Sequence, residues 1–188
     1  MIEMDSEQHM HKGIQIGARP DAGFEDPLGM LKDCHRRIEH FLNILCLVVD
    51  RAANRALTEE ETGAIQAALN YFRVGGQRHN ADEEQSLFPR MRAADATAPL
   101  AEIGGLEHDH RDAEVLHRRA DELYSTWITQ GALAPELHSE LAAATGKLKQ
   151  LYEQHIELEE KVVFPRAAQM LKPDALAAMG EEFRARRA

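Results

Sequence analysis

Apolar residues recur every three or four positions along four long stretches of this chain, with short polar segments between the stretches. In the first stretch the series of apolar residues, with one histidine among them, is Leu31, His35, Ile38, Leu42, Leu45 and Val49. This spacing places the side chains on one face of an α-helix, and such a face is normally buried against neighbouring elements. The first stretch is therefore predicted to be an amphipathic helix.

Three further amphipathic stretches follow with the same period. Thr58-x-x-Glu61 has the sequence of a capping box and opens the second stretch, which continues to about Met91. The remaining landmarks are Pro99 and Gly104-Gly105 at the start of the third stretch, Trp127 near its end, Gly131 and Pro135 in the next turn, and Leu171 near the end of the fourth. Glycine and proline at these places are typical of helix ends and turns.

Four helices of about 25–35 residues with short connections predict an all-α fold, an up-down-up-down four-helix bundle. Residues 1–26 carry Gly, Pro, Asp and His without periodicity, and we expect them to form a flexible N-terminal arm. The bundle is predicted to span residues 27–172, and residues 173–188 are predicted to form a short C-terminal helix.

The composition narrows the class of protein. The chain has 188 residues and a formal charge of −10, so the basic surface of a nucleic-acid-binding protein is not expected. No apolar run approaches the roughly 18 residues of a membrane span, and no secretory leader opens the chain. Cys34 and Cys46 lie about 18 Å apart on one predicted helix, too far to bridge each other. We therefore expect a reduced, cytoplasmic protein without nucleic-acid or membrane partners.

One segment of the chain occurs twice, and this repeat carries the candidate chemistry. The two copies are His79-x-x-x-Glu83-Glu84-x-x-x-Phe88-Pro89 and His155-x-x-x-Glu159-Glu160-x-x-x-Phe164-Pro165. A second repeated piece precedes each copy, with almost the same separation along the chain, as Leu31-x-x-x-His35-Arg36 and Leu106-x-x-x-His110-Arg111. A histidine with a glutamate four residues later puts an imidazole and a carboxylate one turn apart on the same helix face.

The connections are expected to bring the repeated histidines, His35, His79, His110 and His155, to one level of the bundle. Each neighbouring pair lies at a similar distance, about 10–20 residues, from the turn that joins its two helices, and an α-helix has the same rise throughout. All four also occupy positions that face the predicted core. The histidines and the repeated glutamates are therefore predicted to meet inside the bundle.

A metal site competes here with a simpler interpretation. A buried histidine is most often a satisfied core residue, and a glutamate four residues away can be surface charge patterning. With 32 acidic residues among 188, chance predicts about two of the ten histidines with an acidic residue four places on, whereas six have one. Burying four imidazoles and two carboxylates without compensation costs many kcal/mol. A cation removes this cost, so we predict a metal site.

The ligand types indicate which metal. Imidazole and carboxylate without thiolate suit non-haem iron, and manganese less well, whereas structural zinc favours a closed shell of four ligands, usually with cysteine. Six side chains are too many for one tetrahedral ion and suit two ions. The predicted division is two histidines for each metal, with Glu83 and Glu159 bridging both.

These residues resemble the hemerythrin-like HHE cation-binding domains over roughly residues 27–172. The resemblance implies a pair of iron ions with an oxo or hydroxo bridge, held by His35, His79, Glu83, His110, His155 and Glu159. It also implies a small ligand, namely dioxygen, nitric oxide or peroxide, that the protein binds or reacts with. Oxygen-carrying hemerythrins have a further histidine on the third helix, whereas this chain has Glu114 four residues after His110. They also end with an aspartate five residues after the last histidine ligand, whereas this chain has Glu159 four residues after His155.

Several neighbours of the predicted ligands are open to more than one interpretation. Glu39 and Glu114 follow His35 and His110 at the same offset, and they are either further ligands, groups that orient an imidazole, or surface carboxylates. His108 competes with His110 for the ligand position on the third helix, and the repeat favours His110.

Gly76 and Tyr152 stand at equivalent places, three residues before their ligand histidines. One interpretation is tolerated drift; the other is a small opening near one iron, with the Tyr152 hydroxyl available to a bound diatomic molecule or peroxide. Pro89 and Pro165 are expected to kink or end their helices just past the site.

Three classes of function follow from such a centre: reversible binding or sensing of a small oxidant, redox catalysis, and iron storage, iron delivery or iron-centre repair on a partner. Ferritin-like proteins use Glu-x-x-His pairs, a different order and spacing, which disfavours a ferroxidase. Whether the protein is an enzyme and whether it forms a homodimer are left open.

Overall fold

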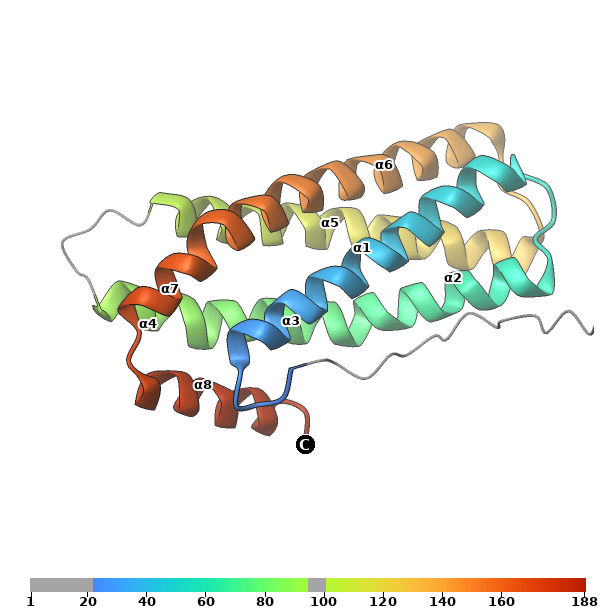
Figure 1. The fold of residues 1–188 in the computed structure, drawn as a ribbon. Coiled ribbons are helices and arrows are strands. Elements are labelled where there is room, and N and C mark those ends of the chain that lie inside the picture. The colour runs from blue at the N-terminus through green and yellow to red at the C-terminus, as the bar shows by residue number, and fades with distance from the viewer. Residues whose placement is uncertain (1–21, 95–100) are drawn as a thin grey trace, which may run out of the picture.

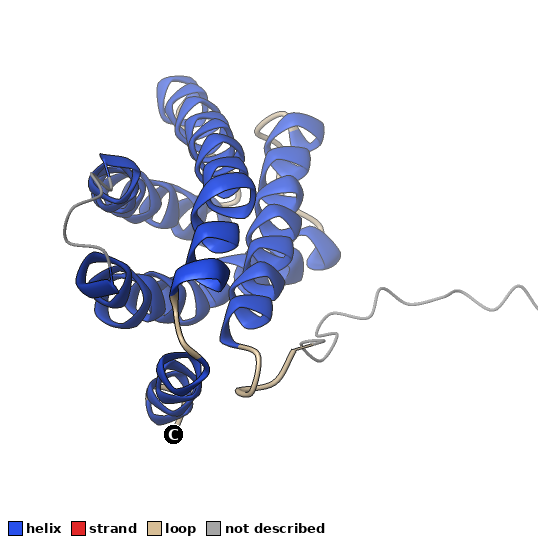
Figure 2. Ribbon diagram, turned by 60° about the vertical axis from the view of Figure 1, so that its left-hand side comes forward, coloured by secondary structure: helices blue, strands red, loops and turns tan. Residues whose placement is uncertain are grey.

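The computed structural model describes residues 22–94 and 101–188, and every regular element within these two segments is helical (Figure 1). Residues 1–21 of the predicted N-terminal arm lie outside the described residues. The long helices lie side by side in a bundle in both views (Figures 1 and 2), which confirms the all-α prediction. Their bounds are α1 Pro27–Ala52, α2 Glu59–Tyr71, η1 Phe72–Gly76, α3 Gln77–Asp82, η2 Glu83–Leu87, α4 Phe88–Ala94, α5 Ala101–Gln130, α6 Pro135–Leu158, η3 Glu159–Val163, α7 Phe164–Met170 and α8 Pro173–Ala185.

Two of the long helices are composite. The second runs from α2 to α4 without a break, and the fourth runs from α6 to α7. The segments η1, η2 and η3 are π-helical turns within them, in which the helix is locally widened. The structure corrects the expectation for Pro89 and Pro165 in part, because neither proline ends its helix.

Local sequence explains where the first two helices begin. Asp26 caps α1 by accepting a hydrogen bond of 2.9 Å from the backbone N–H of Gly29. The predicted capping box of α2 is present: the N–H of Glu61 donates to the Thr58 hydroxyl at 3.2 Å, and the N–H of Thr58 donates to the Glu61 carboxylate at 2.9 Å. Arg55 binds the same carboxylate and, with Thr58, lowers the pKa of Glu61 to about 2.

The third long helix, α5, begins at Ala101, between Pro99 and the Gly104-Gly105 pair that were expected to bracket its start. A glycine inside a helix costs only about 1 kcal/mol relative to alanine. Burial of Ile103 and Leu106 on either side of the two glycines stabilises these first turns. Pro99 lies outside the described residues.

The interior of the bundle consists of two apolar clusters with a layer of ionisable side chains between them. On α1, for example, Leu31 belongs to one cluster and Ile38 to the other, and His35 lies between the two. On the other long helices, too, the histidine lies between a segment that packs in one cluster and a segment that packs in the other. The buried ionisable residues of this layer are His35, His79, Asp82, Glu83, His110, His155 and Glu159.

The C-terminal helix α8 lies alongside the second long helix and α1, near one end of the bundle (Figure 1). Gly180 allows the backbone of the segment before α1 to approach closely, because a Cβ at this position would collide with the carbonyl oxygen of Phe24. Beyond α8, Arg186 and Arg187 each donate to the carboxylate of Asp82, at 2.7 and 2.6 Å. Asp82 is fully buried, so these two arginines neutralise a charge that water does not reach.

Replacing both Arg186 and Arg187 with alanine should lower the free energy of unfolding by about 3–5 kcal/mol, the usual cost of removing the partner of a buried charge. Urea denaturation measures this difference. Arg119→Ala is the matched control, because Arg119 makes a similar set of hydrogen bonds to Glu122 and Glu140 at the surface. Its loss should cost no more than about 1 kcal/mol. Equal effects of the two changes would show that Asp82 does not depend on its arginines.

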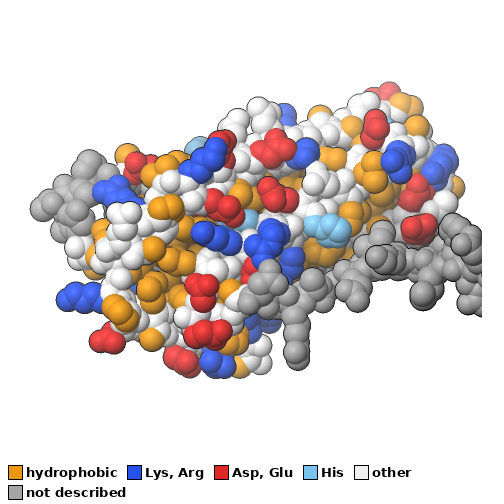
Figure 3. All heavy atoms as spheres, in the orientation of Figure 1, with side chains coloured by type: hydrophobic (Ala, Val, Ile, Leu, Met, Phe, Trp, Pro, Cys, Tyr) orange, Lys and Arg blue, Asp and Glu red, His pale blue; other side chains and the backbone are white. Residues whose placement is uncertain are grey.

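Within the described residues, none of the helices has the length and apolar character needed to cross a membrane. Acidic and basic side chains are interspersed on the face of the molecule seen in Figure 3.

Candidate metal centre

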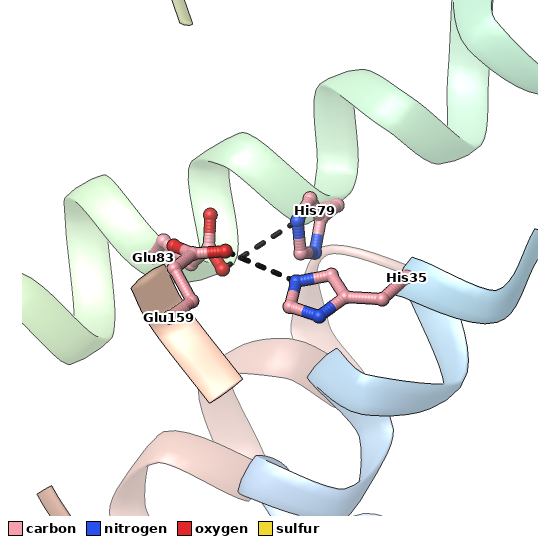
Figure 4. A group of neighbouring side chains, drawn as sticks. All are labelled: His35, His79, Glu83 and Glu159. Carbon is pink, nitrogen blue, oxygen red and sulfur yellow. Dashed lines mark ion pairs between the residues drawn. The ribbon is translucent and has the colours of Figure 1, made fainter. Parts of the chain in front are cut away.

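The structure brings together the six side chains of the sequence-predicted metal site. His35, His79, Glu83 and Glu159 form one group whose nearest ligand atoms all lie within 4.8 Å of one another, and Glu83, His110 and His155 form a second such group. Figure 4 shows the first group, with the His35 imidazole reaching from α1 toward the side chains of the second and fourth long helices. All six side chains are at most 5% exposed.

The Nε2 atoms of the histidines face the two glutamates. In the first group, His35 Nε2 lies 3.1 Å from Glu159 Oε2, and His79 Nε2 lies 3.5 Å from Glu83 Oε1. These imidazole nitrogens and carboxylate oxygens therefore lie next to one another in the interior of the bundle.

The second group shares Glu83 with the first, and Glu159 of the first group also lies beside one of its histidines. His110 Nε2 lies 3.4 Å from Glu83 Oε2, and His155 Nε2 lies 3.3 Å from Glu159 Oε2. The two oxygens of Glu83 therefore face histidines of different groups. This is the placement that a carboxylate needs to bridge two cations.

The hydrogen-bonding capacity of this centre is largely unused. Both carboxylate oxygens of Glu83 and of Glu159, and the Nε2 atoms of His35 and His79, are buried without a hydrogen-bond partner among the described residues. Buried polar atoms are normally paired, and a buried carboxylate without a partner is costly. A set of inward-facing oxygens and imidazole nitrogens with no partner fits a site for cations.

The electrostatics of the two glutamates differ in the metal-free protein. Burial and the neighbouring Glu159 carboxylate raise the pKa of Glu83 well above its usual range. Burial acts in the same direction on Glu159, but His155 and His35 outweigh it and lower its pKa. The pKa of His79 is lowered well below its usual value, mainly by burial. Without a cation, the charged form of Glu83 is therefore unfavourable in the folded protein.

Two of the π-helical turns begin at these glutamates. The N–H of Phe88 donates to the carbonyl oxygen of Glu83, five residues back, and the N–H of Phe164 does the same with Glu159. The proline that follows each phenylalanine lacks an N–H and would clash with the carbonyl four residues back in a regular helix. The wider turn avoids this clash. The Phe-Pro of each repeat therefore sets the backbone geometry at its glutamate.

Three acidic residues that sequence reasoning did not single out hold the outer nitrogens of the histidines. Glu160 lies 2.9 Å from His35 Nδ1, Glu84 lies 2.7 Å from His110 Nδ1, and Asp109 lies 3.4 Å from His155 Nδ1. An Nδ1–H held by a carboxylate leaves Nε2 free to bind a metal and fixes the ring. The doubled glutamate of each repeat was the available signal for two of the three.

Residues 26–167 match the sequence profile of the hemerythrin HHE cation binding domain. The chain belongs to this family. It is also similar to an uncharacterized protein of Haemophilus influenzae, with 29% identity over 171 residues that cover 88% of this chain and 92% of the relative. The HHE resemblance expected from the sequence is thus confirmed. As a member of the hemerythrin HHE family, the chain is a metal-binding protein, and the buried histidine and glutamate cluster fits that role.

Other candidate residues of this HHE domain lie outside the two groups. Glu39 is exposed and lines a small surface cavity, and Glu114 is exposed and forms an ion pair with Arg118. His108 is also exposed and faces Asp112 at 3.6 Å. The structure therefore places these three on the surface, and His110 occupies the third-helix position in the cluster, as the repeat favoured.

A cavity of about 250 Å³ lies beside the centre of the HHE domain, between the second long helix and α5. Gly76 and Tyr152, the two residues singled out by the asymmetry of the repeat, both line it. The Tyr152 hydroxyl lies 3.1 Å from His117 Nε2, and its ring centroid is 6.2 Å from that of His155. Burial lowers the pKa of His117 to about 4, so this imidazole is neutral at pH 7.

Proposed function

We propose that this protein is an up-down-up-down hemerythrin-type bundle that holds two iron ions and that its centre binds or reacts with a small oxidant, namely dioxygen, nitric oxide or peroxide. The observation that carries the proposal is the pair of buried glutamates that face four imidazoles and whose four oxygens have no hydrogen-bond partner among the described residues. Mixed nitrogen and oxygen donors without thiolate favour iron.

In this proposal His35 and His79 would hold one ion, His110 and His155 would hold the other, and Glu83 and Glu159 would serve both. Iron held by imidazole and carboxylate donors would also have room to bind a small exogenous ligand. Iron supplies the binding and redox chemistry once it is bound.

The protein's own contribution is to orient the donors and to exclude bulk water. Glu84, Glu160 and Asp109 hold three of the imidazoles with Nε2 turned inward. The apolar clusters on both sides of the layer keep it dry, which strengthens electrostatic interactions inside it. The cavity lined by Gly76 and Tyr152 gives a small molecule a place to approach the centre.

Replacing Gly76 with leucine should slow the binding of azide or nitric oxide at least about tenfold, corresponding to about 1.4 kcal/mol in the barrier. An added Cβ would meet Phe72 only at an ordinary contact distance of 3.6 Å, so the longer side chain can enter the cavity without disrupting the helix. Stopped-flow absorption measures the rate, and elemental analysis should still find the same iron content.

Gly63→Leu is the control for this experiment. Gly63 lies on the exposed side of α2, and nothing lies within 4 Å of a Cβ built there. It introduces the same side chain far from the cavity and should leave the ligand-binding rate unchanged. Equal rates in the parent chain and in Gly76→Leu would discard the cavity as the route of entry.

The proposed function is tested by mixing the reduced, iron-loaded protein with each oxidant in a stopped-flow spectrometer. A near-ultraviolet band that azide shifts would support an open iron pair. A stable adduct with dioxygen would indicate a carrier or sensor, and rapid oxidation would indicate a catalyst. A centre that is loaded with iron but inert to dioxygen, nitric oxide and peroxide would contradict the proposal.

A further inference from the structure

The internal repeat divides the centre into two halves. The residues of the first half, His35, His79 and Glu83, have His110, His155 and Glu159 as their counterparts in the second. The shift along the chain that carries His35 onto His110 relates α1 to α5, and a nearly identical shift relates the helix of His79 to that of His155. Two of the outer contacts obey this symmetry. Glu160 holds the Nδ1 atom of His35, and its counterpart Glu84 holds that of His110.

The other two histidines break the symmetry. His155 Nδ1 lies 3.4 Å from the carboxylate of Asp109. His79 Nδ1 is buried and has no hydrogen-bond partner within residues 22–94 and 101–188. Asp109 directly precedes His110, and its counterpart directly before His35 is Cys34, so a neutral or weakly acidic thiol replaces a carboxylate in this half.

The charge around Cys34 increases the difference. The guanidinium of Arg37 donates to Cys34 Sγ at 3.6 Å, which adds a positive charge to this half. Among the described residues, the histidines of one half, His110 and His155, thus have two acidic partners at their outer nitrogens. The histidines of the other half have one, the Glu160 partner of His35.

We infer that the two metal positions are inequivalent: the position of His110 and His155 binds a cation more tightly than that of His35 and His79, and the pair Asp109 and Cys34 sets the difference. The inference rests on the proposed pair of metal ions. It assigns Asp109 as a positioning residue that acts through the imidazole of His155.

The physical reason is the effect of an outer hydrogen bond on a ligand. A carboxylate that accepts from Nδ1–H makes the imidazole a stronger donor and fixes its plane, and loss of such a partner typically lowers metal affinity about 10–100-fold. No carboxylate among the described residues accepts from His79 Nδ1, so its imidazole is neither strengthened as a donor nor fixed in this way. We therefore expect the dissociation constants of the two positions to differ about 10–100-fold.

Calorimetric titration of the metal-free full chain with Co²⁺ in the absence of air measures both steps, and the visible absorption of bound Co²⁺ reports on each. The parent chain should bind in two resolved steps. Asp109→Asn should weaken only the tighter step, by about 10–100-fold. Asp109→Cys gives both halves a thiol and should make the two steps nearly equal, both weak.

Cys34→Asp is the converse change and should make the two steps nearly equal and tight. Because Cys34 is buried, this variant can fail to fold, and Asp109→Cys at a partly exposed position then carries the experiment alone. Glu122→Gln is the charge-matched control, since Glu122 lies on the same helix α5 but at the exposed surface, paired with Arg119. It should leave both steps unchanged.

Two equal steps in the parent chain, or two unchanged steps in Asp109→Cys, would overturn the inference. Co²⁺ binding does not depend on reaction with an oxidant, so this result is separable from the proposed function. Two unequal Co²⁺ steps in a chain that is inert to oxidants would support the inference and contradict the proposed function. Two equal Co²⁺ steps in a chain that binds azide at iron would contradict the inference and leave the proposed function standing.

Discussion

Glu83→Gln is expected to abolish binding of the metal pair while leaving the metal-free bundle at least as stable as the parent chain. The two oxygens of Glu83 face histidines of different groups, so one amide substitution removes an anionic donor from both metal positions. Loss of an outer partner of a ligand already costs about 10–100-fold in metal affinity, and loss of a bridging ligand should exceed this. Elemental analysis after reconstitution measures the metal content.

Without metal, the same substitution is expected to raise the stability of the folded chain. The pKa of Glu83 is raised in the folded chain, so its ionised form is disfavoured by folding, and it destabilises the metal-free protein at neutral pH. Glutamine removes this charge, which should stabilise the metal-free bundle by an amount on the order of 1–4 kcal/mol. The gain should shrink as the pH falls through the raised pKa, because the parent carboxyl then takes up a proton.

Glu157→Gln is the matched control for both measurements. Glu157 lies near the same end of the fourth long helix as Glu159, but it is exposed and forms a surface ion pair with Lys161. It should change neither metal content nor stability by a measurable amount. If Glu83→Gln instead kept two metal ions for each chain, or lost stability without metal, Glu83 would be an ordinary structural residue.

Removal of the metal from the parent chain is expected to lower its melting temperature by an amount on the order of 15–30 °C. Each ion that binds only the folded chain adds about 4 kcal/mol when its free concentration is 1,000 times its dissociation constant, and 1 kcal/mol shifts the melting temperature of a chain of this length by about 2–4 °C. Without metal, the buried glutamates lose the counter-charge that offsets their desolvation.

Differential scanning calorimetry of the iron-loaded protein, with and without an excess of chelator, measures this shift. Adding back Fe²⁺ after removal of the chelator should restore the original melting temperature. Glu83→Gln provides the internal control, since a chain that cannot hold the metal should show no response to the chelator. An unchanged melting temperature of the parent chain on chelation would show that the centre does not stabilise the fold through a bound ion.

The sequence was sufficient to predict the helical class and the six side chains that meet in the bundle. The reason lies in the repeat, because periodicity places His35, His79, His110 and His155 on core-facing positions, and helix lengths place them at one height. Glu83 and Glu159 follow their histidines by one turn and must lie on the same face. Local spacing therefore determined these residues without knowledge of the tertiary structure.

What could not be predicted depends on contacts between segments far apart in the chain. The clamp of Arg186 and Arg187 on Asp82 joins the C-terminal end of the chain to the middle of the second long helix, and no local pattern indicates it. The partnership of Asp109 with His155 likewise requires the relative rotation of two helices. That the helix continues past Pro89 was not predicted, because it depends on a π-helical turn that no sequence pattern indicated.

The most direct measurement for the metal pair is anomalous X-ray diffraction at the iron edge from crystals of the iron-reconstituted protein. Two peaks are predicted, one beside the Nε2 atoms of His35 and His79 and one beside those of His110 and His155, with Glu83 and Glu159 between them. No peak at these positions, or iron bound only elsewhere on the chain, would contradict the account.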